Sequence, residues 1–199
     1  FPYTTLFRSY PVPQLTVTQI IERKNAQGLW EAANSVVSGQ IIRFTLTTRL
    51  TNQPATWMNQ QLRATVPKGL SQLSAATLTK QSAAGLSTPI AGLQLLTDSS
   101  TGLPYWSYHN SLPADNFTEA NTQFTLQYTA TVTEEWINQF LLFSSTVTGN
   151  DGGGTPITPI TKEQSLPIKN GTLRFVQMPT TVSFKNLPFP SKRTIYSPS

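Results

Sequence analysis

The chain has 199 residues, of which 38% are hydrophobic and 12% are charged, and its net charge is +5 at neutral pH. This length is enough for a domain with a sizeable core of its own. The sequence has no cysteine, one histidine and nine acidic residues, which excludes disulfides and thiolate chemistry and leaves little for a metal or acid–base site. We therefore expect no enzymatic activity, no metal and no cofactor.

Basic and acidic residues are separated along the chain. Residues 1–80 carry eight Lys or Arg and two acids, residues 81–161 carry six acids and no Lys or Arg, and residues 162–199 carry six Lys or Arg and one acid. The basic C-terminal block fits either contact with an anionic surface or a solvated, loop-rich end. The basic residues do not combine with aromatic residues into a known nucleic-acid module, so nucleic acid is not an expected partner. No apolar run is long enough to span a membrane.

The sequence favours strands over helices, because it contains 30 threonines and few Lys or Glu. Apolar and polar side chains alternate over residues 41–50 and, most clearly, over 124–132, as expected for strands with one buried face. Further strands are predicted over 14–21, 62–66, 73–79, 93–96, 105–108 and 140–148, with turn signals between them. The predicted core contains Phe44, Leu46, Phe124, Leu126, Tyr128 and Val132. This succession of short strands predicts an all-β, antiparallel β-sandwich.

Composition also suggests where the domain begins and ends. Residues 1–13 are expected to form an extended arm and residues 14–154 the sandwich, with an insertion near 81–115 that is rich in small residues. Residues 155–167 contain three prolines and are predicted to be a linker. Residues 168–199 are too few to bury a core alone, so we expect either the start of another domain or an extension docked on the sandwich.

Four segments resemble a known domain through their order. These are LTVTQII, VVSGQIIRFTLTTRLTN, LRATVPKGL and FTLQYTATVTEEWINQFLLFSSTVTGN, which span roughly residues 15–150. In this order they resemble the immunoglobulin-like conserved-repeat domain of large Gram-positive cell-surface proteins. The resemblance implies an immunoglobulin-like antiparallel β-sandwich, here followed by an extended, Pro-rich C-terminal segment.

The C-terminal segment NGTLRFVQMPTTVSFKNLPFPSKRTIY resembles the opening of a WxL domain, a module that binds bacterial cell walls noncovalently. Lys185 stands where that family usually has glycine, and none of the four tryptophans is followed two residues later by leucine. The resemblance implies that cations in and beside this segment contact an anionic wall polymer. These cations are Lys169, Arg174, Lys185, Lys192 and Arg193.

Together the two resemblances imply a non-enzymatic module of a secreted, cell-wall-associated bacterial surface protein, located outside the cell. Such a module serves as a stalk or presents an adhesive surface, and its partners are wall polymers or other surface proteins of the same cell. The alternative is an adhesin domain that binds a host glycan or matrix protein through the insertion at 81–115. A hydrolase is disfavoured because the sequence lacks a cysteine, a second histidine and a nucleophile motif.

The densest aromatic cluster lies inside the insertion, at Tyr105-Trp106-Ser107-Tyr108-His109. In a strand, Trp106 and Tyr108 share one face while Tyr105, Ser107 and His109 share the other. One set is a candidate platform for a sugar ring or a peptide, because aromatic side chains offer a large flat contact area. The predicted ligand-binding residues are Tyr105, Trp106 and Tyr108, with the alternative that Trp106 is the core tryptophan of the sandwich.

Two weaker signals involve asparagine. Asn150 and Asp151 precede three glycines and suggest either a calcium loop or a plain flexible loop, and a single acid favours the plain loop. Surface sandwiches of Gram-positive bacteria sometimes carry a Lys–Asn isopeptide bond, for which Lys24 or Lys80 with Asn138 or Asn150 are conceivable pairs. The spacing favours none of these pairs.

Overall fold

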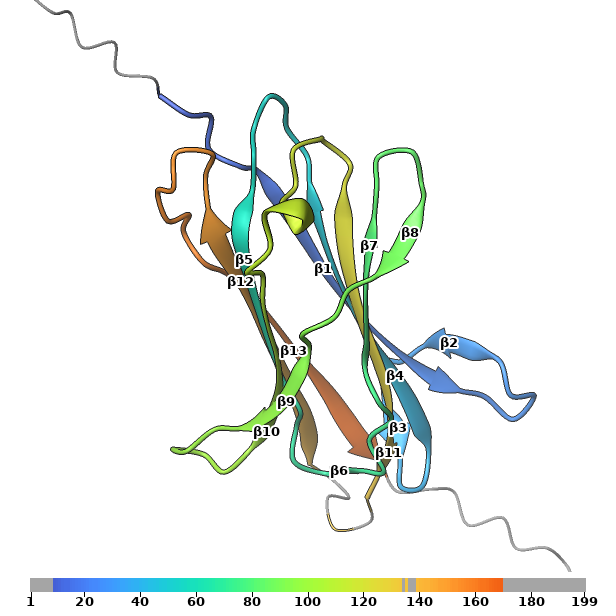
Figure 1. Cartoon of the computed structure of the whole chain (residues 1–199). Coiled ribbons are helices and arrows are strands. Elements are labelled where there is room, and N and C mark those ends of the chain that lie inside the picture. The colour runs from blue at the N-terminus through green and yellow to red at the C-terminus, as the bar shows by residue number, and fades with distance from the viewer. Residues whose placement is uncertain (1–8, 134, 136–138, 170–199) are drawn as a thin grey trace, which may run out of the picture.

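The computed structural model describes residues 9–133, 135 and 139–169, which form two facing β-sheets and one short 3-10 turn, η1 (Pro113–Asp115) (Figure 1). The seven-stranded sheet contains β1 (Leu15–Lys24), β2 (Trp30–Ala32), β4 (Ile41–Leu50), β6 (Leu70–Ser71), β7 (Thr77–Gln81), β8 (Ser87–Pro89) and β11 (Gln123–Val132). The six-stranded sheet contains β3 (Val36–Val37), β5 (Met58–Thr65), β9 (Gln94–Thr97), β10 (Pro104–His109), β12 (Phe140–Asn150) and β13 (Ile160–Lys169). The predicted all-β sandwich is confirmed.

Strand order places the longest strands at the centre of each sheet. The first sheet runs β2-β1-β4-β11-β7-β8, with β6 also paired to β11, and the second runs β3-β13-β12-β5-β10-β9. Neighbouring strands are antiparallel throughout the described part of the chain, except for the parallel pair of β3 with β13. This arrangement is the antiparallel sandwich that the alternating pattern predicts.

The core lies between the sheets and consists of the residues that the alternation selects. All six predicted core residues are buried, including Phe44, Leu126 and Val132. Rings from the two sheets meet there: Phe44 of β4 stacks on Phe143 of β12 at a centroid distance of 5.6 Å. Aromatic side chains contribute large buried areas, so these contacts are a main source of stability.

The chain enters and leaves the described sandwich at opposite ends. Leu15, at the start of β1, pairs with Leu50 at the far end of β4 from Ile41. Lys169, at the end of β13, pairs with Val37, which lies a short turn before Ile41. Figure 1 shows the same arrangement, with β1 starting near one end of the molecule and β13 finishing near the other. Since a ten-residue strand spans about 33 Å, the two positions are separated by about the length of the sandwich.

The segment predicted as an insertion, near 81–115, belongs to both sheets. It supplies β8 at one edge of the seven-stranded sheet, β9 at one edge of the six-stranded sheet, and β10 between β9 and β5. One continuous segment thus borders both sheets on the same side of the sandwich. Its Gly-, Ser- and Thr-rich composition hides this role, because the strands β8 and β9 have only three and four residues.

The predicted linker at 155–167 is wrong from residue 160 onward, because β13 begins there and pairs with β12 from Ile160 to Pro167. The three prolines were the reason for predicting a linker. Pro167 is nevertheless compatible with a strand, because β3 covers only Ile168 and Lys169 and leaves the rest of that edge open. Proline, which lacks an N–H group, is tolerated at such open edges.

Two glycine positions are explained by close packing. A Cβ atom at Gly149 would lie 2.4 Å from Nε1 of Trp57, whose indole is buried against the strand at that point. A Cβ atom at Gly153 would lie 2.6 Å from the ring of Tyr10. Gly152 and Gly153 therefore form the surface on which Tyr10 packs, in the loop between β12 and β13.

Candidate functional site

The aromatic cluster of β10 is divided between the core and the surface. Trp106 and Tyr108 are only 8% and 3% exposed and pack against Tyr128 and Phe124 of the opposite sheet. Burial, with a smaller effect of the Asp115 carboxylate, raises the pKa of Tyr108 to about 12. The prediction that Trp106 and Tyr108 form a solvent-facing platform is therefore wrong, and the alternative of a core tryptophan is correct.

Tyr105, Ser107 and His109 face outward and meet the outward residues of two neighbouring strands. Register pairs Ser107 with Arg63 of β5 and Arg63 with Thr146 of β12. A second row joins His109, Gln61 and Thr148 in the same way. These rows form an open depression of about 380 Å³, here called the outer-sheet depression. Its lining residues are Gln61, Leu62, Arg63, Tyr105, Ser107, Tyr108, His109, Thr146 and Thr148.

Arg63 and Tyr105 form the most defined feature of the outer-sheet depression. The guanidinium carbon of Arg63 lies 3.8 Å from the centroid of the Tyr105 ring, which is a cation–π contact between diagonal neighbours on adjacent strands. The side chain of Arg63 is 44% exposed. The contact therefore fixes the position of the guanidinium while leaving part of it open to solvent.

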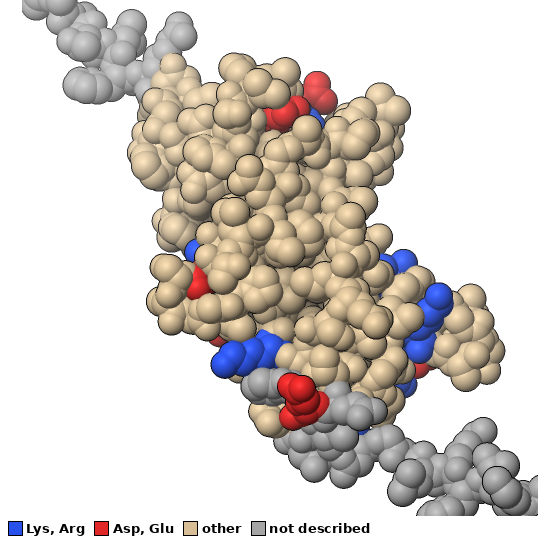
Figure 2. Space-filling model, turned by 60° about the horizontal axis from the view of Figure 1, so that its bottom comes forward, with Lys and Arg blue, Asp and Glu red and all other residues tan. Residues whose placement is uncertain are grey.

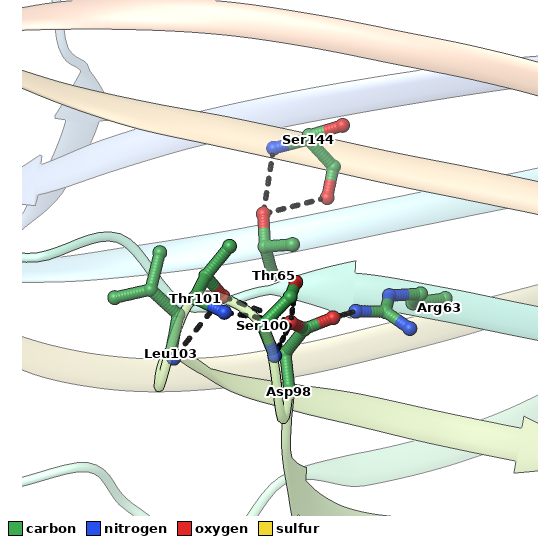
Figure 3. A network of polar contacts seen from close by, with 7 residues as sticks. All are labelled: Arg63, Thr65, Asp98, Ser100, Thr101, Leu103 and Ser144. Atoms are coloured by element: carbon green, nitrogen blue, oxygen red, sulfur yellow. Dashed lines mark hydrogen bonds and ion pairs between the residues drawn. The ribbon is translucent and has the colours of Figure 1, made fainter.

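Asp98, in the turn between β9 and β10, forms an ion pair with Arg63 (Figure 3). One of its carboxylate oxygens pairs with Nη2 of Arg63. The other accepts from the backbone N–H groups of Ser100 and Thr101 at 2.9 and 3.0 Å and from both hydroxyls at 2.6 and 3.2 Å. The bonds from Ser100 and Thr101, together with Arg63, hold the pKa of Asp98 well below its usual range. Asp98 is therefore ionised at any physiological pH and permanently orients Arg63.

Thr65 links the end of β5 to β12 beside this network (Figure 3). Its hydroxyl donates to the backbone oxygen of Ser144 at 2.9 Å and accepts from the backbone N–H of Ser144 at 3.0 Å. The side chain thus continues the hydrogen-bonded ladder beyond the last residue pair, Ala64 with Ser145. This link fixes the floor on which Tyr105, the cross-strand neighbour of Thr65, rests.

The outer-sheet depression is suited to binding rather than to acid–base catalysis. Its charged lining residue is Arg63, and its remaining polar groups are amides, hydroxyls and one imidazole. Within the described ranges, the side chains of Gln61, Ser107 and His109 have no hydrogen-bond partner, so they are available to a ligand. Among the described residues no cluster of His, Cys, Asp and Glu has the makeup of a metal site.

The structure also places part of the predicted wall-contact site and the loop that was considered for calcium. Of the predicted wall-contact residues, Lys169 lies exposed at the end of β13, and Arg174, Lys185, Lys192 and Arg193 lie outside the described residues. The Asp151 carboxylate accepts from the backbone N–H groups of Gly153 and Thr155, each at 2.8 Å. Asp151 therefore closes its own turn, which is the plain-loop alternative to a calcium site.

The lysines considered for a covalent cross-link have other partners. Lys80 donates from Nζ to the backbone oxygens of Ala114 and Asn116, both at 3.2 Å, and its partial burial lowers its pKa. Nζ of Lys24 lies 5.8 Å from the centroid of the Trp30 ring. Asn150 donates from its side chain to the backbone oxygen of Gly154, and Asn138 is outside the described residues.

The sequence alone did not identify Arg63, Gln61, Thr146 and Thr148 as neighbours of Tyr105. Alternation places Gln61 and Arg63 on the outward face of β5, which is the only signal available. Their approach to Tyr105 depends on the register between β5 and β10, which are far apart in the sequence.

No helix in the described part of the chain is long and apolar enough to cross a membrane.

No protein-family model and no curated protein matches the chain in sequence. Among solved structures, the C-terminal domain of the Streptococcus pyogenes antigen I/II-family protein AspA aligns with a TM-score of 0.50 and 11% identity, covering 76% of this chain and 46% of that one. A variant of BcpA, the major pilin subunit of Bacillus cereus, aligns with a TM-score of 0.50 and 12% identity, covering 80% of this chain and 41% of that one.

The chain spans less than half the length of each of these two solved structures. At this level of identity the similarity establishes a shared immunoglobulin-like sandwich fold. A fold of this kind supports many activities, so function must be argued from the geometry of this chain.

Proposed function

We propose that the chain is a spacer module of a secreted, cell-wall-associated bacterial surface protein, a stalk domain that holds other parts of the protein away from the cell. The observation that carries this proposal is the position of Leu15 and Lys169 at opposite ends of the sandwich. A module joined through these two positions adds its full length to a chain of domains. In this proposal the module has a mechanical role and no enzymatic one.

The same geometry suits a module under tension. β1 pairs with β4 from Leu15 to Arg23, and β13 pairs with β12 from Ile160 to Pro167. A force applied at Leu15 and Lys169 is directed along these strands, so the hydrogen bonds of each ladder are loaded together. Breaking many bonds at once is harder than breaking them one after another, which makes this the resistant direction for forced unfolding.

Surface composition agrees with an exposed position outside the cell. Figure 2 shows a face with few charged residues, over which neutral side chains predominate. On the outer side of the seven-stranded sheet, Thr18, Thr47, Thr125 and Thr79 lie in one row across four strands. Threonine supplies both strand propensity and a hydrated hydroxyl. The shared fold with an antigen I/II-family protein and a pilin subunit supports the same placement.

Attachment to the wall is proposed for the C-terminal region, on the WxL-like pattern of its sequence. Exposed cations such as Lys169 are attracted to anionic wall polymers, and this attraction is screened by salt. Purified walls should retain the full chain weakly and release it as salt is raised, while a version ending at Lys169 should be retained less. The cut must follow Lys169, because β13 extends to that residue. Equal, salt-resistant retention of both versions would contradict the proposal.

The spacer role is tested on living cells. The chain is placed between a wall anchor and a fluorescent reporter in a Gram-positive host, and a Gly–Ser linker of equal length is the matched control. Cells are then treated with an extracellular protease. The reporter should remain on cells that carry the folded chain and be lost from cells that carry the linker, because a packed sandwich opens rarely. Cleavage within residues 15–169 at the rate of the linker would contradict the spacer role.

A second candidate function is adhesion to a glycan or matrix protein, as the sequence of the 81–115 segment suggested. The observation that favours it is the outer-sheet depression, to which that segment contributes Tyr105, Ser107 and His109. A spacer alone does not require an arginine that is held by both a tyrosine ring and an aspartate. The two functions are compatible, because the depression lies on the side of the sandwich and leaves both ends free.

A further inference from the structure

We infer that the outer-sheet depression binds a glycan that carries carboxylate groups, with Arg63 as the residue that recognises the carboxylate. This inference deepens the adhesion candidate and rests on it, while the spacer role stands independently. It follows from three properties of the depression: which of its groups are free, what charge it carries, and how firmly that charge is positioned.

Along β5, the central strand of the depression, the described structure offers side chains rather than backbone groups. β5 lies between β10 and β12 and is paired with both, so its N–H and C=O groups are used within the sheet. An extended peptide that recognises proteins by adding a strand needs an open edge, which β5 does not have. Recognition must use the hydroxyl, amide and imidazole groups of Gln61, Ser107 and His109. These groups match a ligand whose surface is made of hydroxyls.

The charge of the depression selects an acidic ligand. Arg63 is its charged lining residue, and none of the described residues that line it is an acid. Asp98 lies next to Arg63 and accepts four hydrogen bonds on one oxygen and the arginine on the other, so its carboxylate is held in the turn and only one nitrogen of the guanidinium is used. Arg63 uses Nη2 for Asp98, while its Nε and Nη1 have no partner among the described residues. Guanidinium N–H groups of this kind form strong bonds with carboxylates.

The position of Arg63 is fixed before a ligand arrives. Stacking on Tyr105 at 3.8 Å and pairing with Asp98 hold the guanidinium in one place beside the depression. An arginine that is already ordered loses less conformational entropy on binding than a free one. The Tyr105 ring supports the guanidinium on one face, so its contribution to binding is to hold the cation in place.

The test is an NMR titration of the full chain with two carboxylate-bearing probes, tetragalacturonic acid and 3′-sialyllactose. The neutral controls are galactotetraose and lactose, and a tetraglutamate peptide tests the acidic-peptide alternative. We expect saturable shifts at Gln61, Arg63 and Ser107 with at least one carboxylate-bearing sugar, and none with its neutral control. Arg63→Gln should weaken this binding about 10- to 100-fold, since hydrogen bonds to charged groups contribute about 1.5–3 kcal/mol.

The matched control is Arg49→Gln, which removes an exposed arginine from the outer face of the other sheet and should leave binding unchanged. Ser107→Leu fills the depression without removing charge and should abolish binding, so the test does not depend on one variant. The inference is overturned if neither acidic sugar shifts the depression, if the neutral sugars bind equally well, or if the peptide binds as tightly. None of these results bears on protease resistance at the cell surface, so the spacer role is judged separately.

Discussion

Gly149 shows how one residue sets the packing of a strand. It lies on β12 where the register with β5 shifts between Thr148 and Asn150, and the buried indole of Trp57 occupies the space of a side chain. The bulge and the missing side chain together allow the two strands to close over a tryptophan. Any larger residue at this position must displace either the indole or the backbone of Met58, which would lie 2.7 Å from a Cβ atom.

Gly149→Ala should therefore lower the free energy of unfolding by about 1–3 kcal/mol, the range for overpacking a core. The control is Gly85→Ala, where no atom lies within 4 Å of the added Cβ and the positive φ of +86° alone opposes the substitution. Chemical denaturation of both variants provides the comparison. If Gly149→Ala lowers the free energy of unfolding no more than Gly85→Ala does, the close approach of Trp57 is not a constraint.

Tyr128 carries a hydroxyl that the core does not use. The residue is 2% exposed, stacks on Phe44 at 5.0 Å, and its hydroxyl has no hydrogen-bond partner within the described ranges. Burial raises its pKa far above the usual value. Tyr128→Phe keeps the ring and removes an unpaired polar group, so stability should rise by about 1 kcal/mol and Tm by about 2–4 °C. Calorimetry should show no such gain for the control Tyr105→Phe, and a loss of stability in Tyr128→Phe would contradict this account.

Asp98 gives the molecule a residue-scale pH dependence. Its pKa is depressed in the folded state, so its contribution to stability is fully present above the unfolded value of about 3.9 and is lost as pH falls through the folded value. The pairing with Arg63 should therefore persist at pH 3, where an ordinary aspartate is mostly protonated. Carbonyl chemical shifts recorded from pH 7 to pH 2 measure this directly. Protonation of Asp98 near pH 4 would show that the turn does not hold it.

At the scale of elements, strands with a regular alternation were predicted most accurately. β4 and β11 were predicted within a residue or two of their bounds, because apolar residues at every second position require a half-buried strand. The strand β8 is short and exposed and was not predicted, whereas β9 was predicted within a residue of its bounds from the short apolar run at 93–96. β13 was hidden by its neighbouring prolines, which are tolerated at an open edge.

The outer-sheet depression, the proposed binding site, was predictable only in part for the same reason. Alternation within β10 separates Tyr105 from Trp106, and this division held. The sequence gives no measure of which strand lies beside β10, and Arg63 is brought to Tyr105 by that pairing. Burial also depends on the opposite sheet, so the choice of the exposed face could not be made from β10 alone.

The β12–β13 ladder should be among the protected parts of the molecule. Amides of β13 that bond to β12 should exchange with solvent as slowly as those between β4 and β11, because both ladders are long and cover the core. Ala83 and Ala84, which are exposed in the turn between β7 and β8, serve as the rapidly exchanging reference. Fast exchange throughout 160–169 would restore the linker prediction and remove one strand from the sandwich.

At the scale of the whole molecule, the two ends and the side of the sandwich have different roles. The ends carry Leu15 and Lys169, through which load is transmitted in the proposed spacer, and the side carries the outer-sheet depression. Tyr10 adds a contact between the N-terminal arm and the loop before β13. This contact joins the segment before β1, the first described strand, to the loop before β13, the last one.

The measurement that tests the spacer proposal most directly is single-molecule unfolding in two pulling directions. The chain contains no cysteine, so single attachment points can be introduced at Gln14 with Lys169, or at Lys24 with Lys169. The first pair loads β1 and β13 along their length, whereas the second pulls both strands from the same end and opens their ladders one bond at a time. We predict a several-fold higher unfolding force for the first pair. Equal forces, or a lower force for the first pair, would contradict the proposal that the module is built to bear load between its ends.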